Sequence, residues 1–375
     1  MTRRSTALCA LVLLSAYWSP ARAFSVASSA GDPCHERMTM AAWEGVFESL
    51  PESATHVVAP EGGIWRALAK RLLPGVGLDP SVLSDEDSFA LVSLVLGARA
   101  PDTDGHSVAD IDAMRMLHAD TSEEGQYAHA LRALHDDGPE GNARALAGTR
   151  ALLRELLDEA ISWLEHPPVE RNTQTTVYMD FYGEVDVHVD GFAFTVGKAA
   201  HLVQDSFSHT VRSEESDWHE ILHVLNYIDA INDDIDEEQD GLAHSARMDE
   251  CNHPDVAPIA DAAVVATGEL FLALVAELRE GDGEAVEEFM DDWLTLRPGC
   301  DLSNELCGHP EELTLARKKP TEPILASAFG CSAGEAPAHS LTAGFFAVFL
   351  PFAFLFFRFH RVGIALPERA KAELP

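Results

Sequence analysis

Helical periodicity is the feature that most constrains how this chain can fold. Apolar residues recur at i, i+3, i+4 and i+7 in segment after segment, which places them on one face of an α-helix. Only Gln174–Asp190 alternates and is rich in β-branched residues, as a strand or an extended loop would be. We therefore predict an all-α, multi-helix bundle in one domain. The predicted helices are Thr39–Leu50, Asp85–Ala98, Val108–Leu117, Glu123–His135, Asn142–Leu164, Phe194–Val211, Asp217–Ile231, Ala257–Arg279 and Gly283–Leu296.

The charge of the chain limits its partners. Among 375 residues, 62 are Asp or Glu and 26 are Lys or Arg, which gives a formal net charge of −36. With 46% hydrophobic residues the chain is too apolar to be a disordered acidic protein. Because Lys and Arg supply most non-specific affinity for nucleic acid, this balance argues against nucleic-acid binding by charge alone. If the protein handles phosphates, a metal must supply the positive charge.

The first residues have the pattern of a secretory signal peptide. Arg3 and Arg4 precede an apolar run, and the triplet Ala21-Arg22-Ala23 predicts cleavage before Phe24. The alternative is a retained membrane anchor, but the run is shorter than the roughly 20 residues that a spanning helix needs. We expect residues 1–23 to be removed and the body to be exported.

The C-terminal region predicts a membrane helix. Leu341–Phe357 is a 17-residue uncharged stretch that Arg358 and Arg361 follow closely. By the positive-inside rule, the basic tail of residues 358–375 is cytoplasmic and everything before Leu341 is outside. We expect a helical metal-binding domain over residues 24–319, a linker over 320–340, and a periplasmic or cell-surface protein that is membrane-anchored. The tail also resembles the cleavable C-terminal sorting tails of some Gram-negative bacteria, which would instead be processed.

Four cysteines lie in the predicted exported body. An oxidising location predicts two disulfides, a local one between Cys300 and Cys307 and a long-range one between Cys34 and Cys251. The alternative, a zinc site formed by thiolates, lacks a CxxC spacing.

The sequence Gly197-KAA-His201-LVQ-Asp205-SFS-His209-Thr210 is the most informative for chemistry. Positions i, i+4 and i+8 of a helix form one stripe, so His201, Asp205 and His209 would lie together. His219 and His223 repeat the spacing downstream. A single His here could be a hydrogen-bonded core residue, but burying the stripe without a metal or full hydrogen bonding would be costly. We predict a metal site.

Further ligand-type residues lie upstream, and the ordered set is similar to a known family. His35 precedes a Thr-x-x-Ala sequence, and Asp102 and Asp104 are followed by His118. With the His-x-x-x-Asp helix, this order resembles the zinc-dependent phospholipase C and single-strand nuclease superfamily. The phrase GKAAHLVQDSFSHT also looks like its heterokaryon-incompatibility (Het-C) branch.

The resemblance implies a helical bundle that holds three zinc ions in a cleft. Asp205 would bridge two of them. The implied ligand groups are His35 with the amine of Phe24, then Asp104 and His118 with His201, and finally His209 with His223. Tyr227 stands where the family places a carboxylate, so either His219 substitutes for it or the third zinc site is weak or absent.

The chemistry that these residues would support is phosphodiester hydrolysis. Two or three zinc ions can clamp the attacking and leaving oxygens and lower the pKa of bound water. Whichever of Asp102 and Asp104 is not a ligand could act as general base.

The acidic run Asn232–Gly241 resembles a calcium loop only in composition, so a solvated turn is favoured over weak calcium binding.

We expect a surface-tethered, zinc-dependent phospholipase C-like hydrolase whose C-terminal helix holds it beside a phospholipid substrate. Two alternatives remain. A single-strand nuclease would need a basic groove with stacking aromatics, and Phe207, Trp218 and Tyr227 have no Lys or Arg beside them. A non-catalytic, zinc-stabilised surface protein is the other, and Tyr227 is the feature that favours it.

Overall fold

The computed structural model describes residues 33–106, 117, 122–133, 136, 140–179, 183–225 and 250–299. Several predictions lie outside these residues and stay predictions. They concern the signal peptide and Phe24, most of the helix Val108–Leu117, His118, Tyr227, the run Asn232–Gly241, Cys300, Cys307, the linker, the C-terminal helix and the basic tail.

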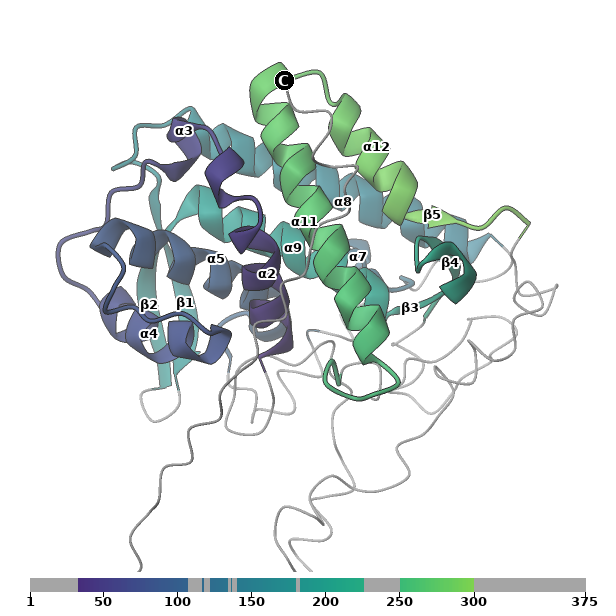
Figure 1. Cartoon of the computed structure of the whole chain (residues 1–375), viewed down its shortest axis with the longest axis horizontal. Helices are drawn as coiled ribbons and strands as arrows, with labels where there is room; N and C mark the ends of the chain where they lie inside the picture. The colour runs from purple at the N-terminus through teal and green to yellow at the C-terminus, as the bar shows by residue number, and fades with distance from the viewer. Residues whose placement is uncertain are drawn as a thin grey trace, which may run out of the picture. The chain divides into compact units, whose positions relative to one another are not determined.

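Helices form the bulk of the described structure, and α9 (Gly191–Ser208) lies at its centre (Figure 1). Nearly every residue of α9 is buried, because other helices pack around it. The long neighbours are α2 (Cys34–Glu44), α5 (Asp85–Thr103), α8 (Gly141–Leu164) and α11 (Ala257–Glu280). The other elements are α3 (Glu52–Thr55), α4 (Trp65–Leu72), α7 (Glu123–Ala128), α12 (Glu284–Trp293) and the 3₁₀ turns η1 (Phe47–Ser49), η2 (Leu73–Val76) and η3 (Glu214–Ser216).

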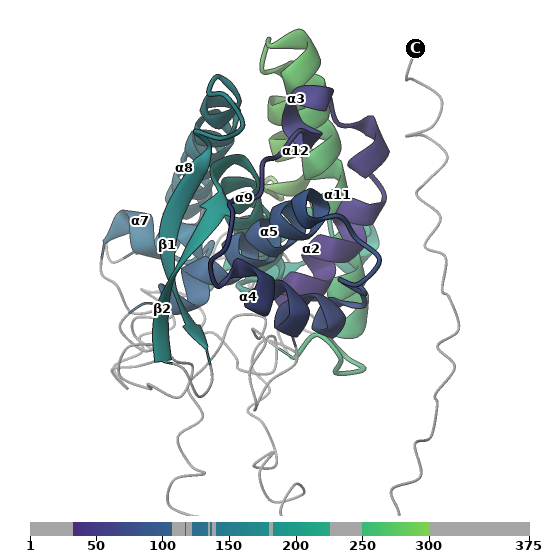
Figure 2. The same ribbon diagram turned by 90° about the vertical axis from the view of Figure 1, so that its left-hand side faces the viewer.

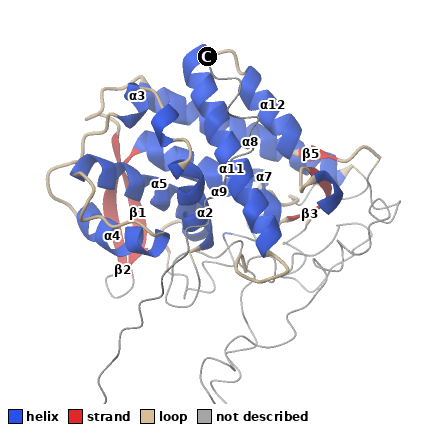
Figure 3. Ribbon diagram, viewed as in Figure 1, coloured by secondary structure: helices blue, strands red, loops and turns tan. Residues whose placement is uncertain are grey.

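Two small sheets correct the all-α prediction, although helix predominates as expected. β1 (Asn172–Met179) and β2 (Gly183–Asp190) form an antiparallel hairpin in the segment whose alternation indicated strand or extended loop. Figure 2 shows this hairpin on one side of α5 and α9, with α11 and α12 on the other. The second sheet has the order β3 (Thr210–Arg212), β4 (Glu220–Val224), β5 (Thr295–Leu296), antiparallel and then parallel (Figure 3).

The helix predicted over Asp217–Ile231 is wrong where β4 lies. Ile221, Leu222 and Val224 are fully buried, as every side chain of a short strand inside a core can be. A short apolar run of this kind is compatible with either helix or strand. The helix predicted to extend to Val211 ends at Ser208, because Thr210–Arg212 pair with β4.

One helix among the described residues, α11, is long and apolar enough to cross a membrane. However, 61% of its most apolar window is buried inside the protein. It packs against α2, α9 and α12, and Ala266, Leu270, Phe271 and Leu274 are fully buried. Burial in the protein core accounts for its apolar character.

Candidate metal centre

The centre of the site is a pair of residues on α9. His201 and Asp205 lie one turn apart, and both are completely buried. His201 Nε2 is 2.9 Å from Asp205 Oδ2. The i, i+4 spacing seen in the sequence therefore produces a direct contact between an imidazole and a carboxylate.

Two glycines allow α5 to approach α9 closely. A Cβ atom on Gly197 of α9 would collide with the backbone oxygen of Leu94 on α5, and one on Gly97 would collide with that of Phe194. The backbones are thus in contact, and His201 Nδ1 lies 2.8 Å from the carbonyl oxygen of Ala98. This contact fixes the ring of His201 and brings the end of α5 to the site.

Four side chains from three helices meet at this point. One ligand atom from each lies within 4.8 Å of all the others, and all four residues are buried. His35 Nε2 is 3.3 Å from Asp205 Oδ1 and 3.6 Å from Asp102 Oδ2. His201 Nε2 is 3.7 Å from Asp102 Oδ1. Both carboxylates therefore present one oxygen to His35 and the other to His201.

His129 is a fifth member of this group, and our sequence analysis did not identify it. Its Nδ1 is 2.8 Å from Asp205 Oδ2 and 3.9 Å from Asp102 Oδ1. It follows the last residue of α7, and the next residue, Ala130, has a left-handed φ of 49°. Within an expected helix, His129 has no ligand-type residue at i+4, so spacing alone could not single it out.

The charges at the site favour a cation. Burial raises the pKa of Asp205, but His201, His209 and His35 lower it well below its usual value. Burial lowers the pKa of His201, but the Asp205 and Asp102 carboxylates and the hydrogen bonds from the ring raise it to about 9. A buried carboxylate pair requires positive charge nearby. Here a proton on imidazole or a metal ion can provide it.

The donor set fits a metal ion. Imidazole nitrogens and carboxylate oxygens are ligands for zinc and for other divalent transition metals. Metal-binding histidines usually donate their second ring N–H to a carbonyl or carboxylate, as His201 Nδ1 can to Ala98. His35, Asp102, His201 and Asp205 could therefore hold a metal ion.

Other residues predicted as ligands lie outside this group. Asp104 is exposed, with a left-handed φ of 38° just beyond the end of α5. The aspartate of this segment that lies in the group is Asp102, where we expected Asp104. His219 stacks on Trp293 with ring centroids 3.8 Å apart. His209 is buried, and its Nδ1 donates to the carbonyl oxygen of His129. His209 therefore supports the backbone of His129, and its Nδ1 lies 3.8 Å from Asp205 Oδ2.

His223 has surroundings that disfavour a cation. Asn142 Oδ1 accepts from the backbone N–H of Val224 at 2.9 Å, so its Nδ2 donates to His223 Nδ1 at 3.1 Å. Burial and the Arg132 guanidinium lower the pKa of His223 to about 3. The described residues thus give no support for a metal shared by His209 and His223.

The predicted disulfide between Cys34 and Cys251 is confirmed. It links residues 217 positions apart, with their Cα atoms 6.0 Å from each other. Cys34 is the first residue of α2 and is adjacent to His35. The disulfide therefore holds the end of the helix that carries a site residue. It is compatible with an exported protein.

Comparison with known proteins gives one partial similarity. Hemolysin-1 of Aeromonas salmonicida is 27% identical over an alignment of 154 residues that covers 38% of this chain. The chain spans 25% of the length of that protein. No family model and no solved structure matched.

Proposed function

We propose that this protein is a metal-dependent hydrolase of phosphodiester bonds and that phospholipids are its substrate class. One observation carries the proposal: two buried carboxylates each place one oxygen near His35 and the other near His201 and His129. A carboxylate divided in this way can bridge two cations. Sites with two metals are typical of enzymes that displace groups at phosphorus.

The side chains of the group have defined tasks in this proposal. Divalent cations held here would generate hydroxide from water near neutral pH and would neutralise the charge of a phosphate group. Asp205, Asp102, His35, His129 and His201 would hold the cations. None of the five side chains is Lys or Arg, so the group binds an anionic phosphate only through the cations. Asp104 is exposed and is not among the side chains that meet at this point.

Zinc is the cation that we propose, because the order of these residues resembles the zinc-dependent superfamily and because zinc accepts both nitrogen and oxygen ligands. We propose that the five side chains of the group hold two ions. A third ion would need His209, His223 and residues beyond the described ones, and Arg132 beside His223 works against it.

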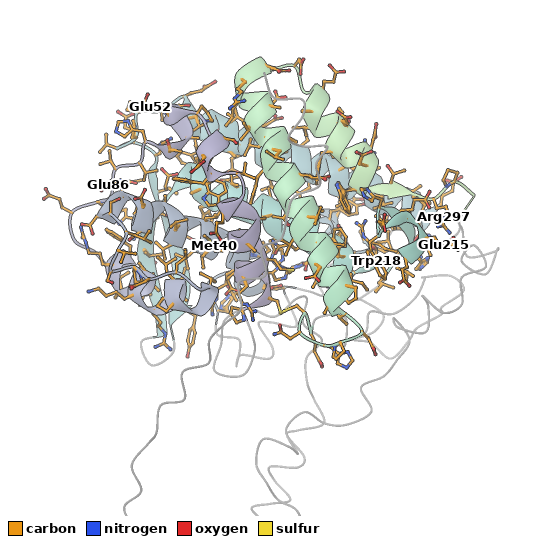
Figure 4. All side chains as sticks on the ribbon, viewed as in Figure 1. Met40, Glu52, Glu86, Glu215, Trp218 and Arg297 are labelled. Atoms are coloured by element: carbon orange, nitrogen blue, oxygen red, sulfur yellow. A yellow bond between two sulfur atoms is a disulfide. The ribbon has the colours of Figure 1, made fainter. Side chains whose placement is uncertain are left out.

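Phospholipid is favoured over nucleic acid for three reasons. The net charge of −36 repels a polyanion, whereas a zwitterionic headgroup carries no net charge. Contrary to our expectation, two of the aromatic residues have an Arg beside them: Arg212 lies over the ring of Phe207, and Figure 4 shows Trp218 beside Glu215 and Arg297. Phe207 is fully buried, however, and Trp218 lies at the β4–β5 end, apart from Met40 on the site helix α2, so neither ring offers bases a stacking surface at the metal centre. Hemolysin-1 is named for the lysis of blood cells, and an action on membranes would be in keeping with a phospholipid substrate.

The test combines metal analysis with hydrolysis by the full chain. Protein purified without chelators should contain at least about two zinc ions per chain and should cleave a phosphocholine ester faster than single-stranded DNA. Asp205→Asn should lower this rate at least about a hundredfold, as expected for the loss of a main electrostatic stabiliser. His188→Ala changes an exposed histidine on β2 and should leave the rate within about twofold.

Each contrary result has a definite meaning. Faster cleavage of DNA would replace the phospholipase proposal by a single-strand nuclease. Zinc-loaded protein that hydrolyses neither substrate would indicate a non-catalytic surface protein. Folded protein that binds no metal would reject the metal centre itself.

A further inference from the structure

A buried glutamine connects the metal centre to a further helix, α11, and to a second residue of α2. Gln204 lies on α9 beside Asp205 and has no exposed surface. Its side-chain oxygen is 2.8 Å from His35 Nδ1. Its Nε2 is 2.9 Å from the hydroxyl of Thr39 on α2 and 3.4 Å from that of Thr267 on α11. Both threonines are also completely buried.

The amide has two arrangements with different consequences for His35. With Oε1 toward Nδ1, the ring must carry its proton on Nδ1, and Nε2 presents a lone pair toward Asp205 and Asp102. With the amide turned over, Nε2 of Gln204 donates to His35 Nδ1 while Oε1 accepts from the backbone N–H and hydroxyl of Thr39. The neutral ring then has its proton on Nε2 and donates toward the carboxylates.

Only the first arrangement suits metal binding through Nε2. A ligand nitrogen must offer a lone pair to the ion, and an N–H there would exclude it. The second arrangement suits the metal-free site, where the Nε2–H of the neutral His35 ring points toward the carboxylates of Asp205 and Asp102. The Thr39 hydroxyl serves both, because it both donates and accepts. The backbone N–H of Thr39 and the carbonyl oxygen of His35 gain a partner in the amide only in the second arrangement, so the metal ion must hold the first.

We propose that Gln204 is the positioning residue of the metal centre: its amide oxygen accepts the Nδ1–H of His35 when metal is bound, and the amide turns over when metal is absent. The inference rests on the proposed metal centre. Gln204 itself touches neither metal nor substrate. It acts through the orientation and proton position of His35.

Matched substitutions at Gln204 test this role by zinc affinity. Gln204→Met keeps the length of the side chain but removes the acceptor, and it should weaken zinc binding at least about tenfold, since loss of a partner behind a ligand costs about 10–100-fold. Gln204→Glu keeps an acceptor toward His35 and should hold the affinity within about threefold of wild type. Thr267→Val removes the 3.4 Å contact with Gln204 and the hydrogen bond from the Thr267 hydroxyl to the Ala263 carbonyl oxygen, but nothing that touches His35, and should also stay within about threefold. Competition with a chromophoric chelator measures all four proteins.

A spectroscopic readout needs no variant and therefore does not depend on folding of the mutants. In ¹⁵N-histidine-labelled wild type loaded with zinc, His35 should show a proton on Nδ1 that is protected from exchange. In metal-free protein, the proton should move to Nε2. A zinc-loaded His35 without a proton on Nδ1 would overturn the inference.

The outcomes separate this inference from the proposed function. If wild type binds no zinc, the metal centre is rejected. If wild type binds zinc and Gln204→Met binds it equally well, only the role of Gln204 is rejected. Loss of thermal stability in Gln204→Met with unchanged zinc affinity would show that the amide only joins the helices, and would likewise reject the positioning role.

Discussion

His129 belongs to the candidate metal centre although its spacing in the sequence did not indicate this. It is mostly buried and contacts Asp205 and Asp102 from a short segment after α7, not from one of the long helices. His209 donates to its carbonyl oxygen, and Ala130 beside it adopts a left-handed backbone. A non-glycine residue in that region costs free energy, so the surrounding structure must hold the segment in place.

We predict that His129→Ala weakens zinc binding at least about tenfold, because it removes a nitrogen donor beside Asp205. Zinc titration of the full chain would measure this, with exposed His188→Ala as the control. His118→Ala provides the comparison, because the family resemblance assigns this ligand role to His118. Strong loss in His118→Ala with none in His129→Ala would contradict our assignment.

For individual residues, sequence spacing predicted a contact in the site only within one helix. His201 and Asp205 share a face of α9 because positions i and i+4 must do so. For α5 the family order suggested Asp104, but α5 continues to Thr103 and turns sharply at Asp104, so Asp102 points into the core. Such an end-of-helix orientation depends on tertiary packing.

At the scale of elements, the contact of α5 with α9 assembles the site. Gly97 and Gly197 meet where the two backbones touch, and the Ala98 carbonyl reaches His201 across this contact. The periodicity indicated both helices. The periodicity of each helix does not predict that the two helices cross at these glycines, because the crossing point depends on how the surfaces of both helices fit together.

Gly197→Ala should lower the free energy of unfolding by about 1–3 kcal/mol, because a Cβ there would force the helices apart. The change should also weaken zinc binding by displacing His201 from Ala98. Urea denaturation and zinc titration measure the two effects.

The matched control is Gly268→Ala in α11, where an added Cβ has no atom within 4 Å. A helical glycine replaced without strain should stabilise the protein by about 0.4–1 kcal/mol. Equal effects of the two substitutions would refute the contact argument.

The disulfide acts on another element, the first turn of α2. Pro33 precedes this helix, and no side chain caps its N-terminus. The paired variant Cys34→Ser with Cys251→Ser should lose about 2–5 kcal/mol of stability, as when a native disulfide is removed from a small secreted domain. Zinc affinity should also fall, because His35 lies in the turn that is released. Unchanged zinc affinity in the folded double variant would show that the disulfide only stabilises.

At the scale of the whole molecule, the sequence indicated a helical body and the segment that forms β1 and β2, but not the second sheet. β3 and β4 are short, and β5 pairs with β4 across a large separation in sequence. Local periodicity cannot detect pairing of this kind. The same holds for the site, which gathers residues from α2, α5 and α9 and from the end of α7.

The buried His223 should make the stability of the molecule depend on pH. Its pKa is lowered to about 3 in the folded protein, against a usual value of 6.5. Between these values the unfolded chain binds a proton that the folded protein does not, so stability falls as pH drops from about 6.5 toward 3. The free energy of unfolding changes by about 1.4 kcal/mol per pH unit in this range.

His223→Gln keeps an acceptor for Asn142 and should remove this part of the pH dependence. Urea denaturation at several pH values compares the two proteins, and identical slopes would contradict the prediction.

The net charge of the molecule should decide which lipid surface it can use. A chain of net charge −36 is repelled by anionic vesicles, and the repulsion is screened over about 30 Å at 0.01 M salt but about 8 Å at 0.15 M. If the proposed function holds, hydrolysis of zwitterionic phosphocholine vesicles should change little with salt. Hydrolysis of anionic phosphoglycerol vesicles should be slow at low salt and should rise several-fold as salt is added at constant zinc.

Initial rates on the two kinds of vesicle at both salt concentrations test this dependence, with Asp205→Asn as the control for hydrolysis by this site. A soluble short-chain phosphocholine ester separates the approach to a surface from the chemical step, since its rate should not respond to vesicle charge. Faster cleavage of anionic vesicles at low salt would mean that a local basic surface, and not the net charge, governs docking. In that case the argument that a chain of this charge avoids polyanions would no longer favour phospholipid over nucleic acid.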